Sequence, residues 1–234
     1  LGTYEGQTQA QANMGTLPRL SLEQKRDPDY EALPRYWVPE ERVNERVEER
    51  WDKRWFIGWR DICHSTNERT LISSAFPWAA VPDGTLLMFP GISQVGPLLG
   101  NLAAFVLDFV VRQKSGGTHL KYFTVKQLPV LPPKSYEIPA GWDRGVLLRD
   151  WIVDRVAELS CTTWDMEPLA RDLGVNGPPF VWDEERRLVM RAELDAAYFR
   201  LYGVERDDVG YIMDSFGAFR RNDPERFERT KALI

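Results

Sequence analysis

Apolar residues between positions 98 and 113 repeat with the period of an α-helix. The stripe expected of a helix buried along one face is formed, at i, i+4, i+7 and i+11, by Leu98, Leu102, Phe105 and Phe109. Further apolar residues widen this stripe, so we expect the helix to be covered on two sides. The periodicity ends at Gln113, and the glycines at 116 and 117 make continuation of the helix costly. The pattern predicts one buried helix that leads into a glycine turn.

Short runs rich in aromatic and β-branched residues predict strands at 55–62, 71–77, 86–89 and, as a short fourth strand, 121–125. Helical periodicity and suitable first-turn residues predict further helices at 39–53, 144–159, 166–173, 183–201 and 207–216. Asp183 is the expected N-terminal cap of the longest of these helices, and Asp223 with Pro224 marks another helix start.

This order of elements predicts an α+β fold. We expect a mixed domain with a small sheet and the buried helix at residues 36–138, followed by a small all-helical subdomain at residues 139–234. Residues 1–35 are rich in glutamine and punctuated by proline, which is typical of a connecting arm. Because the chain starts with Leu1 and not with methionine, we expect this arm to come from an upstream domain of a longer protein.

Composition limits the classes of function. The chain has 234 residues, a hydrophobic fraction of 43% and nine tryptophans, which indicates a folded globular protein. Its net charge of −5 excludes a protein coated in positive charge, so any contact with nucleic acid must be a local basic face. Cys63 and Cys161 are far apart, as expected of reduced thiols in the cytoplasm. Asn101 and Asp108 interrupt the longest apolar run, so we expect no membrane partner.

One segment departs from the acidic balance of the chain. Residues 109–134 contain no carboxylate, and they carry Arg112, Lys114, Lys121, Lys126 and Lys134. Glycines allow a close approach of the backbone to a ligand, and exposed amides beside lysine and arginine suit phosphate. A solvated loop that is basic by chance explains the same residues, and both interpretations remain open at this point.

No catalytic or metal-binding pattern emerges from the sequence. His64 and His119 are the only histidines, and Cys63 is adjacent to His64 instead of being spaced as a metal ligand would be. The segment 176–180, Asn-Gly-Pro-Pro-Phe, is similar to the Asn-Pro-Pro-aromatic motif of amino-methyltransferases, but Gly177 breaks its spacing and no glycine-rich loop precedes it. We interpret this segment as a turn, and we predict a non-catalytic chain without a cofactor or metal of its own.

The order of several short motifs along the chain indicates a protein family more specifically than composition does. The chain has Asn-Glu-Arg-Thr at 67–70, Leu-Gly-Asn-Leu at 99–102, Phe-Val-Leu-Asp at 105–108, Arg-Gln-Lys at 112–114, Gly-Gly-Thr-His-Leu at 116–120 and Val-Lys-Gln-Leu-Pro-Val-Leu-Pro-Pro at 125–133. Its last third has Arg-Ala-Glu-Leu-Asp-Ala-Ala-Tyr-Phe at 191–199, Leu-Tyr-Gly at 201–203, Arg-Asp-Asp-Val at 206–209 and Tyr-Ile-Met-Asp at 211–214. Nearly the whole chain thereby closely resembles the C-terminal half of large bacterial adenine-specific (N6) DNA methyltransferases of type IIG-like restriction–modification or phage-defence systems.

The order of helix, glycine-rich turn and Leu-Pro-x-x-Pro-Pro exit is also similar to the target-recognition domains of type I specificity subunits. The resemblance implies a target-recognition region that binds double-stranded DNA and selects the methylation site. The S-adenosylmethionine site and the adenine pocket would then belong to the upstream methyltransferase domain of the same polypeptide. Side chains would read base edges in the major groove, cations would hold phosphates, and the target base would flip into that domain.

We expect the DNA contacts in and around the glycine turn. The predicted set is Arg112, Lys114, Gly116, Gly117, Thr118, His119 and Lys121, with Lys126, Asn67 and Arg69 as additional candidates. Arg112 and His119 could either read bases or only stabilise the turn. For Asn67 and Arg69 we favour a strand-edge hydrogen bond and a surface ion pair over DNA contact. Because family motifs support a fold or a backbone contact, we expect the base readers in other loops, at 93–95 or 65–67.

A different class of function is also compatible with the sequence. Four tryptophans of the last third could dock the upstream domain or another protein of the same defence system, and they are Trp142, Trp151, Trp164 and Trp182. Such a scaffold would form a protein complex without binding DNA. An independent enzyme ranks last, because no catalytic constellation is present.

Overall fold

The computed structural model describes residues 2–64 and 67–234 of the chain. Within them, β1 (Trp55–Arg60) lies between β2 (Ser73–Pro77) and β3 (Thr85–Met88) in one antiparallel sheet. Five of the six residues of β1 are buried, as expected of a central strand that is covered on both faces. The predicted α+β class and the first three predicted strands are confirmed.

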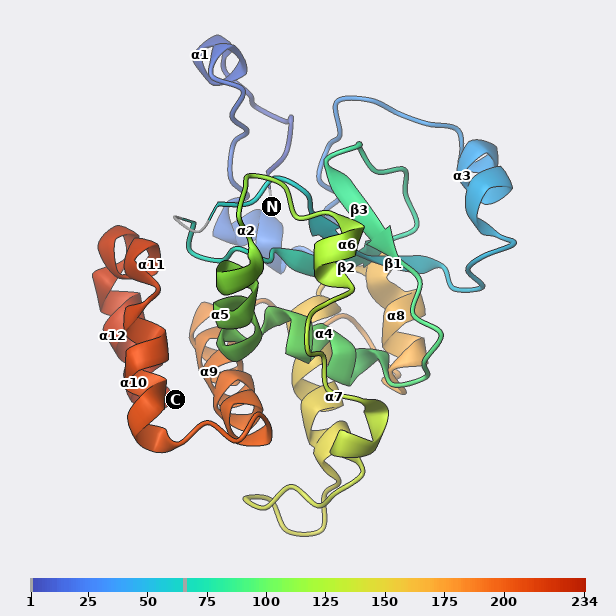
Figure 1. Ribbon diagram of the computed structural model, residues 1–234. Coiled ribbons are helices and arrows are strands. Elements are labelled where there is room, and N and C mark those ends of the chain that lie inside the picture. Colours follow the sequence, from blue (N-terminus) through green and yellow to red (C-terminus); the bar gives the residue numbers. More distant parts are fainter. Residues whose placement is uncertain (1, 65–66) are drawn as a thin grey trace.

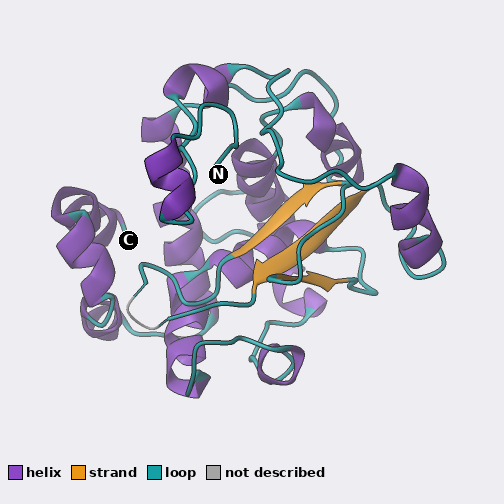
Figure 2. Cartoon of the chain, turned by 90° about the horizontal axis from the view of Figure 1, so that it is seen from above, coloured by secondary structure: helices purple, strands orange, loops and turns teal. Residues whose placement is uncertain are grey.

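Helices surround this small sheet (Figure 2). In chain order they are α1 (Gln9–Asn13), α2 (Leu22–Arg26), α3 (Glu40–Val47), α4 (Val95–Ala103), α5 (Phe105–Lys114), α6 (Tyr122–Val125), α7 (Leu148–Ser160), α8 (Glu167–Asp172), α9 (Glu184–Leu201), α10 (Arg206–Asp214), α11 (Gly217–Asn222) and α12 (Pro224–Leu233), with 3₁₀ turns η1 (Pro133–Tyr136) and η2 (Trp164–Met166). Asp183 and Asp223 cap α9 and α12 as predicted, since their carboxylates accept backbone N–H bonds from Arg186 and Arg226. The short helix α11 was not predicted.

The buried helix predicted at 98–113 is two helices. Ala104 has an extended backbone (φ −72°, ψ 142°), and α4 and α5 meet there at an angle of 62°. The Phe105 N–H, which would otherwise lack a partner at the start of α5, donates to the Asp195 carboxylate of α9 at 2.7 Å. A single continuous helix was therefore wrong, because a side chain 90 residues away caps a second helix start.

The two polar residues that interrupt the apolar run are hydrogen-bonding centres of the core. Asp108 accepts N–H bonds from Thr70 at 3.0 Å and Leu71 at 2.7 Å, and so ties α5 to the segment that enters β2. Asn101 is fully buried, accepts the N–H of Leu131 and donates to the Tyr202 hydroxyl. Both side chains have the partners that burial of a polar group requires.

The fourth predicted strand, at 121–125, is wrong, because these residues form α6. The N–H groups of Thr124 and Val125 bond to the carbonyl of Lys121, which closes a local helical turn. Extended backbone is found just before this segment, where His119 forms an isolated antiparallel bridge with Ile62, beyond the end of β1. A local helical turn thus forms here in spite of the β propensity of this aromatic and β-branched run.

One hydrophobic cluster runs through both parts of the chain, from Trp55 and Leu102 to Tyr198 and Phe219. Helix α4 packs against β2 and α7, and α9 packs against α5, α7 and α12. The described part of the arm, residues 2–35, contacts the helical part through the backbone N–H of Trp164, which donates to the Pro28 carbonyl, while α1 projects away from the body (Figure 1). Among the described residues, no single helix has the length and apolarity of a membrane span; α4 and α5 meet those criteria only as a bent pair.

Candidate functional site

The predicted glycine turn follows α5 and is anchored to the end of β1. The Cys63 N–H donates to the Thr118 carbonyl at 2.9 Å, and the Leu120 N–H donates to the Asp61 carbonyl at 2.7 Å. Leu120 is fully buried at the base of the turn, whereas the residues from Gly116 to His119 are exposed. A Cβ added to Gly116 or Gly117 would meet no atom within 4 Å. The turn therefore has a fixed base and an open tip.

A buried carboxylate holds two of the predicted contact residues. Oδ2 of Asp61 accepts from Lys121 Nζ at 2.8 Å and lies 2.8 Å from Nδ1 of His119. The hydrogen bond from Lys121 contributes most to lowering the pKa of Asp61, and the same bond raises the pKa of Lys121. Lys121 thus remains charged, but part of its field is compensated by Asp61 before any ligand arrives.

The uncompensated charge of this surface comes from Lys114 and Lys126. Both side chains are exposed, and neither forms an ion pair within residues 2–64 and 67–234. Tyr122 and Phe123 of α6 are 45% and 68% exposed on the same stretch of chain between the lysines. We use the term turn surface for residues 114–126. The aromatic part of the turn surface was not predicted, although an aromatic pair between lysines is a usable signal for stacking on bases.

Arg112 does not belong to the turn surface. Its side chain is only 7% exposed and donates to Asp108 at 3.3 Å, and its Nη2 donates to the carbonyls of Asn67 at 2.8 Å and Glu68 at 3.1 Å. Its guanidinium also lies 4.1 Å from the ring centre of Phe216. Arg112 braces the loop before β2 against α5. This position favours a stabilising role over an exposed DNA contact.

Arg69 also points inward. Its guanidinium lies 3.2 Å from the ring centre of Phe105 and pairs with Asp195 at 3.5 Å. Asn67 is half-buried and is engaged through its carbonyl by Arg112. The favoured reading of Arg69 as part of an ion pair holds, but the pair is internal. Of the loops expected to read bases, 93–95 runs from exposed Ser93 to buried Val95, whereas 65 and 66 lie outside the described residues.

The short motifs of the sequence meet in space around these internal contacts. Arg69 of the Asn-Glu-Arg-Thr motif pairs with Asp195 of the Arg-Ala-Glu-Leu-Asp motif, and Arg112 of the Arg-Gln-Lys motif binds the backbone of the first. Glu68 pairs with Arg226 of α12 at 2.6 Å. These motifs therefore form a structural frame that joins β2, α5, α9 and α12.

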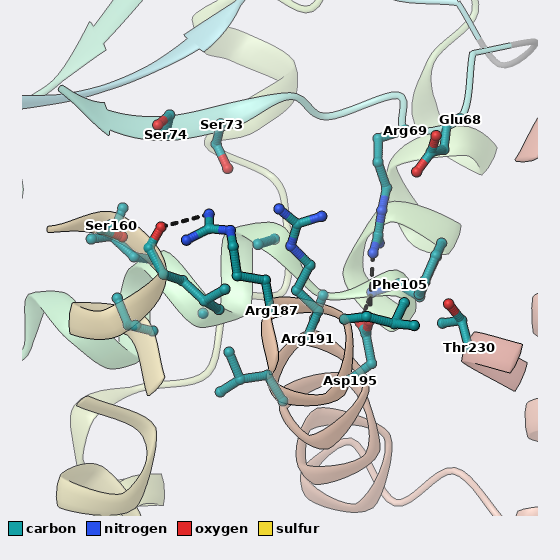
Figure 3. A pocket seen from close by; sticks show the side chains of 18 of the residues that line it. Glu68, Arg69, Ser73, Ser74, Phe105, Ser160, Arg187, Arg191, Asp195 and Thr230 are labelled. Atoms are coloured by element: carbon teal, nitrogen blue, oxygen red, sulfur yellow. Dashed lines mark hydrogen bonds and ion pairs between the residues drawn. The ribbon is translucent and has the colours of Figure 1, made fainter. Parts of the chain in front are cut away.

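A second site lies beneath β2, where this frame leaves a cavity of about 310 Å³. Four arginines line it: Arg69, Arg187, Arg191 and Arg226. Figure 3 shows the side chains of Arg187 and Arg191 rising from α9 toward Ser73 of β2. This pocket was not predicted from the sequence. A signal existed in the spacing of Arg187, Arg191 and Asp195 at i, i+4 and i+8, which puts all three on one face of a helix.

Comparison of the chain with protein-family models, with curated proteins and with solved structures finds no match. The resemblance to adenine-specific DNA methyltransferases consequently stays a prediction.

Proposed function

We propose that this chain recognises double-stranded DNA for a site-specific adenine-N6 methyltransferase of a restriction–modification or phage-defence system. The observation that carries the proposal is the turn surface, a carboxylate-free segment whose base is hydrogen-bonded to the residues that follow β1 and whose tip is open. A rigid base holds phosphate-binding groups in register without the entropic cost of ordering a loop on binding.

The residues of the turn surface have different roles in this proposal. Lys114 and Lys126 bind phosphates as point charges, and the amides of Gly116 and Gly117 allow the backbone to approach the duplex closely. Asp61 holds the side chains of His119 and Lys121 in a fixed orientation. In this proposal they contribute oriented hydrogen-bond donors more than uncompensated positive charge. Methyl transfer from S-adenosylmethionine, and the pocket for the flipped adenine, belong in this proposal to the upstream domain of the parent polypeptide.

The test is the binding of a fluorescein-labelled duplex, measured by polarisation across a salt series. Each lost phosphate contact lowers the slope of log K against log salt by about 0.9. The double variant K114Q/K126Q should bind all duplex sequences more weakly and with a slope reduced by about 1.8, twice that amount. The double variant R42Q/R171Q removes the same charge from exposed positions of α3 and α8, and it should leave the slope unchanged. Equal slopes for the two double variants would refute the assignment of the turn surface.

A docking function remains the second candidate, because one exposed aromatic segment favours it. Tyr36 and Trp37 are 75% and 74% exposed just before α3. Of the tryptophans considered for docking, Trp151 is buried, whereas Trp142 and Trp164 are 43% and 46% exposed. Docking predicts a complex with the upstream domain that the variant W37A weakens while DNA affinity is unchanged. Sedimentation of the two separately produced parts would distinguish this result from DNA recognition.

A further inference from the structure

The arginine-lined pocket contains more positive charge than its own carboxylates balance. Its lining includes four arginines and two carboxylates, Glu68 and Asp195. Arg226 pairs with Glu68 at 2.6 Å, and Arg69 pairs with Asp195 at 3.5 Å. Within the described residues, the guanidinium groups of Arg187 and Arg191 form no ion pair with a carboxylate, and that of Arg187 stacks on the Trp182 ring, 3.6 Å from its centre.

Arg187 has donors that nothing in the described residues satisfies. The residue is 92% buried, since its exposed fraction is 8%, and its Nη2 donates to the Leu159 carbonyl at 2.8 Å. Its Nε and Nη1 are buried and have no hydrogen-bond partner among residues 2–64 and 67–234. A buried charged donor without a partner is costly, and an anion in the cavity would remove that cost. Nη1 of Arg69 is a further buried donor without a partner in this part of the chain.

Arg191 lies one helical turn further along α9 and faces the cavity. It is exposed, and within the described residues its side chain makes no hydrogen bond or ion pair. Desolvation lowers the pKa of Arg191, and the positive charges of Arg69 and Arg226 lower it further, whereas the carboxylates of Glu68 and Asp195 oppose this shift. Desolvation likewise lowers the pKa of Arg187 to about 10. Mutual repulsion of this kind is relieved when an anion binds between the cations.

The charge, lining and volume of the cavity indicate which class of ligand it can bind. Planar guanidinium groups suit the oxygens of carboxylates and phosphates, but a phosphomonoester carries about −1.5 to −2 charge near pH 7, close to the two uncompensated cations. Much of the remaining wall is apolar and includes Leu99, Val156, Leu159, Leu188 and Leu194. A volume of about 310 Å³ is at the small end of ligand pockets and leaves room beside a phosphate for a small organic group.

We infer that this pocket binds a phosphomonoester of about mononucleotide size, with its phosphate on Arg187 and Arg191 and its organic part against the apolar wall. Ser73 of β2 lies opposite the arginines and offers its hydroxyl group to the same ligand (Figure 3). This inference is independent of DNA recognition by the turn surface. The pocket lies beneath β2, and its lining includes none of the exposed lysines of the turn surface.

Isothermal titration calorimetry of the whole chain tests the inference with three probes: AMP, ribose 5-phosphate and inorganic phosphate. Adenosine, which lacks the phosphate, is the control ligand. We expect AMP and ribose 5-phosphate to bind more tightly than inorganic phosphate, and adenosine to give no signal. R191Q should weaken binding of the phosphate esters roughly tenfold or more, because it removes a charged donor. R191K, which keeps the charge but not the planar fork, should retain part of the affinity, and R171Q on the surface of α8 should retain all of it.

A short oligonucleotide with and without a 5′-phosphate distinguishes a free nucleotide from a nucleic-acid end as the source of the phosphomonoester. Binding that requires the 5′-phosphate and is lost in R191Q supports the pocket, with a DNA end as its ligand. Absence of binding by all phosphate probes at millimolar concentration, or equal affinity in the wild type and R191Q, would overturn the inference. R187Q provides a second variant, and circular dichroism shows whether either variant is folded. K114Q/K126Q should bind AMP normally, so failure of the two proposals can be told apart.

Discussion

Replacing Asp195 by asparagine should remove a large part of the pH dependence of the stability of this protein. Asp195 is 3% exposed, accepts the Phe105 N–H at 2.7 Å and pairs with Arg69 at 3.5 Å. Burial raises the pKa of Asp195 from an ordinary 3.8 to about 6, since desolvation of the carboxylate outweighs the opposing effects of Arg69 and the Phe105 N–H. The native chain therefore keeps this proton over a range of pH in which the unfolded chain has released it.

The sign and size of the effect follow from this difference. When the native state binds more protons than the unfolded state, the free energy of unfolding falls as pH rises, here between about pH 4 and pH 6. At about 1.4 kcal/mol per pH unit, the full loss is roughly 3 kcal/mol by pH 7. Asparagine cannot ionise and keeps an oxygen for the Phe105 N–H. It also places an amide group near Arg69, but that cost does not vary with pH.

Urea unfolding followed by tryptophan fluorescence, at half-unit steps from pH 4 to pH 8, provides the measurement. The stability of the wild type minus that of D195N should fall by roughly 3 kcal/mol across the lower part of this range. D52N, at an exposed position after α3, shows what loss of a surface carboxylate does under the same conditions. A difference between wild type and D195N that stays constant with pH, or that grows as pH rises, would refute the burial argument.

Two further predictions concern the core. G100A should destabilise the protein by about 1–3 kcal/mol in thermal or urea unfolding, because its Cβ would lie 2.8 Å from the Tyr198 hydroxyl, which donates to the Pro97 carbonyl. G116A, whose Cβ would meet no atom within 4 Å, is the matched control. Equal stability of the two variants would contradict the close packing at Gly100. Burial raises the pKa of Cys161 to about 12, so its thiol should react with N-ethylmaleimide only after unfolding, and rapid labelling of the native chain by mass spectrometry would show the burial to be wrong.

Elements set by local interactions could be predicted from the sequence. The caps Asp183 and Asp223 act on backbone amides three residues away, so residue type and spacing were enough to locate the starts of α9 and α12. The strands at β1, β2 and β3 followed from aromatic and β-branched runs, which favour extended backbone wherever they pair. The exposure of Gly116 and Gly117 followed in the same way from the end of the helical period.

Features that depend on distant partners could not be predicted. The break at Ala104 requires Asp195, and nothing in the apolar stripe of residues 98–113 signals that a carboxylate from α9 will reach the Phe105 amide. Lys121 looked like a free cation until Asp61 came to lie 2.8 Å from it. Arg112, equally basic in the sequence, lies in the interior because the loop at 67–68 presents carbonyls to it.

By itself the sequence determined the class of fold, the caps and the position of the basic glycine turn, since those depend on backbone propensity and on neighbours a few residues away. The tertiary structure alone decided which cations remain available to a ligand. That outcome depends on which carboxylates and carbonyls the packing brings within hydrogen-bonding distance. It left Lys114 and Lys126 exposed on the turn surface, and it left Arg187 and Arg191 facing a cavity without a carboxylate of their own.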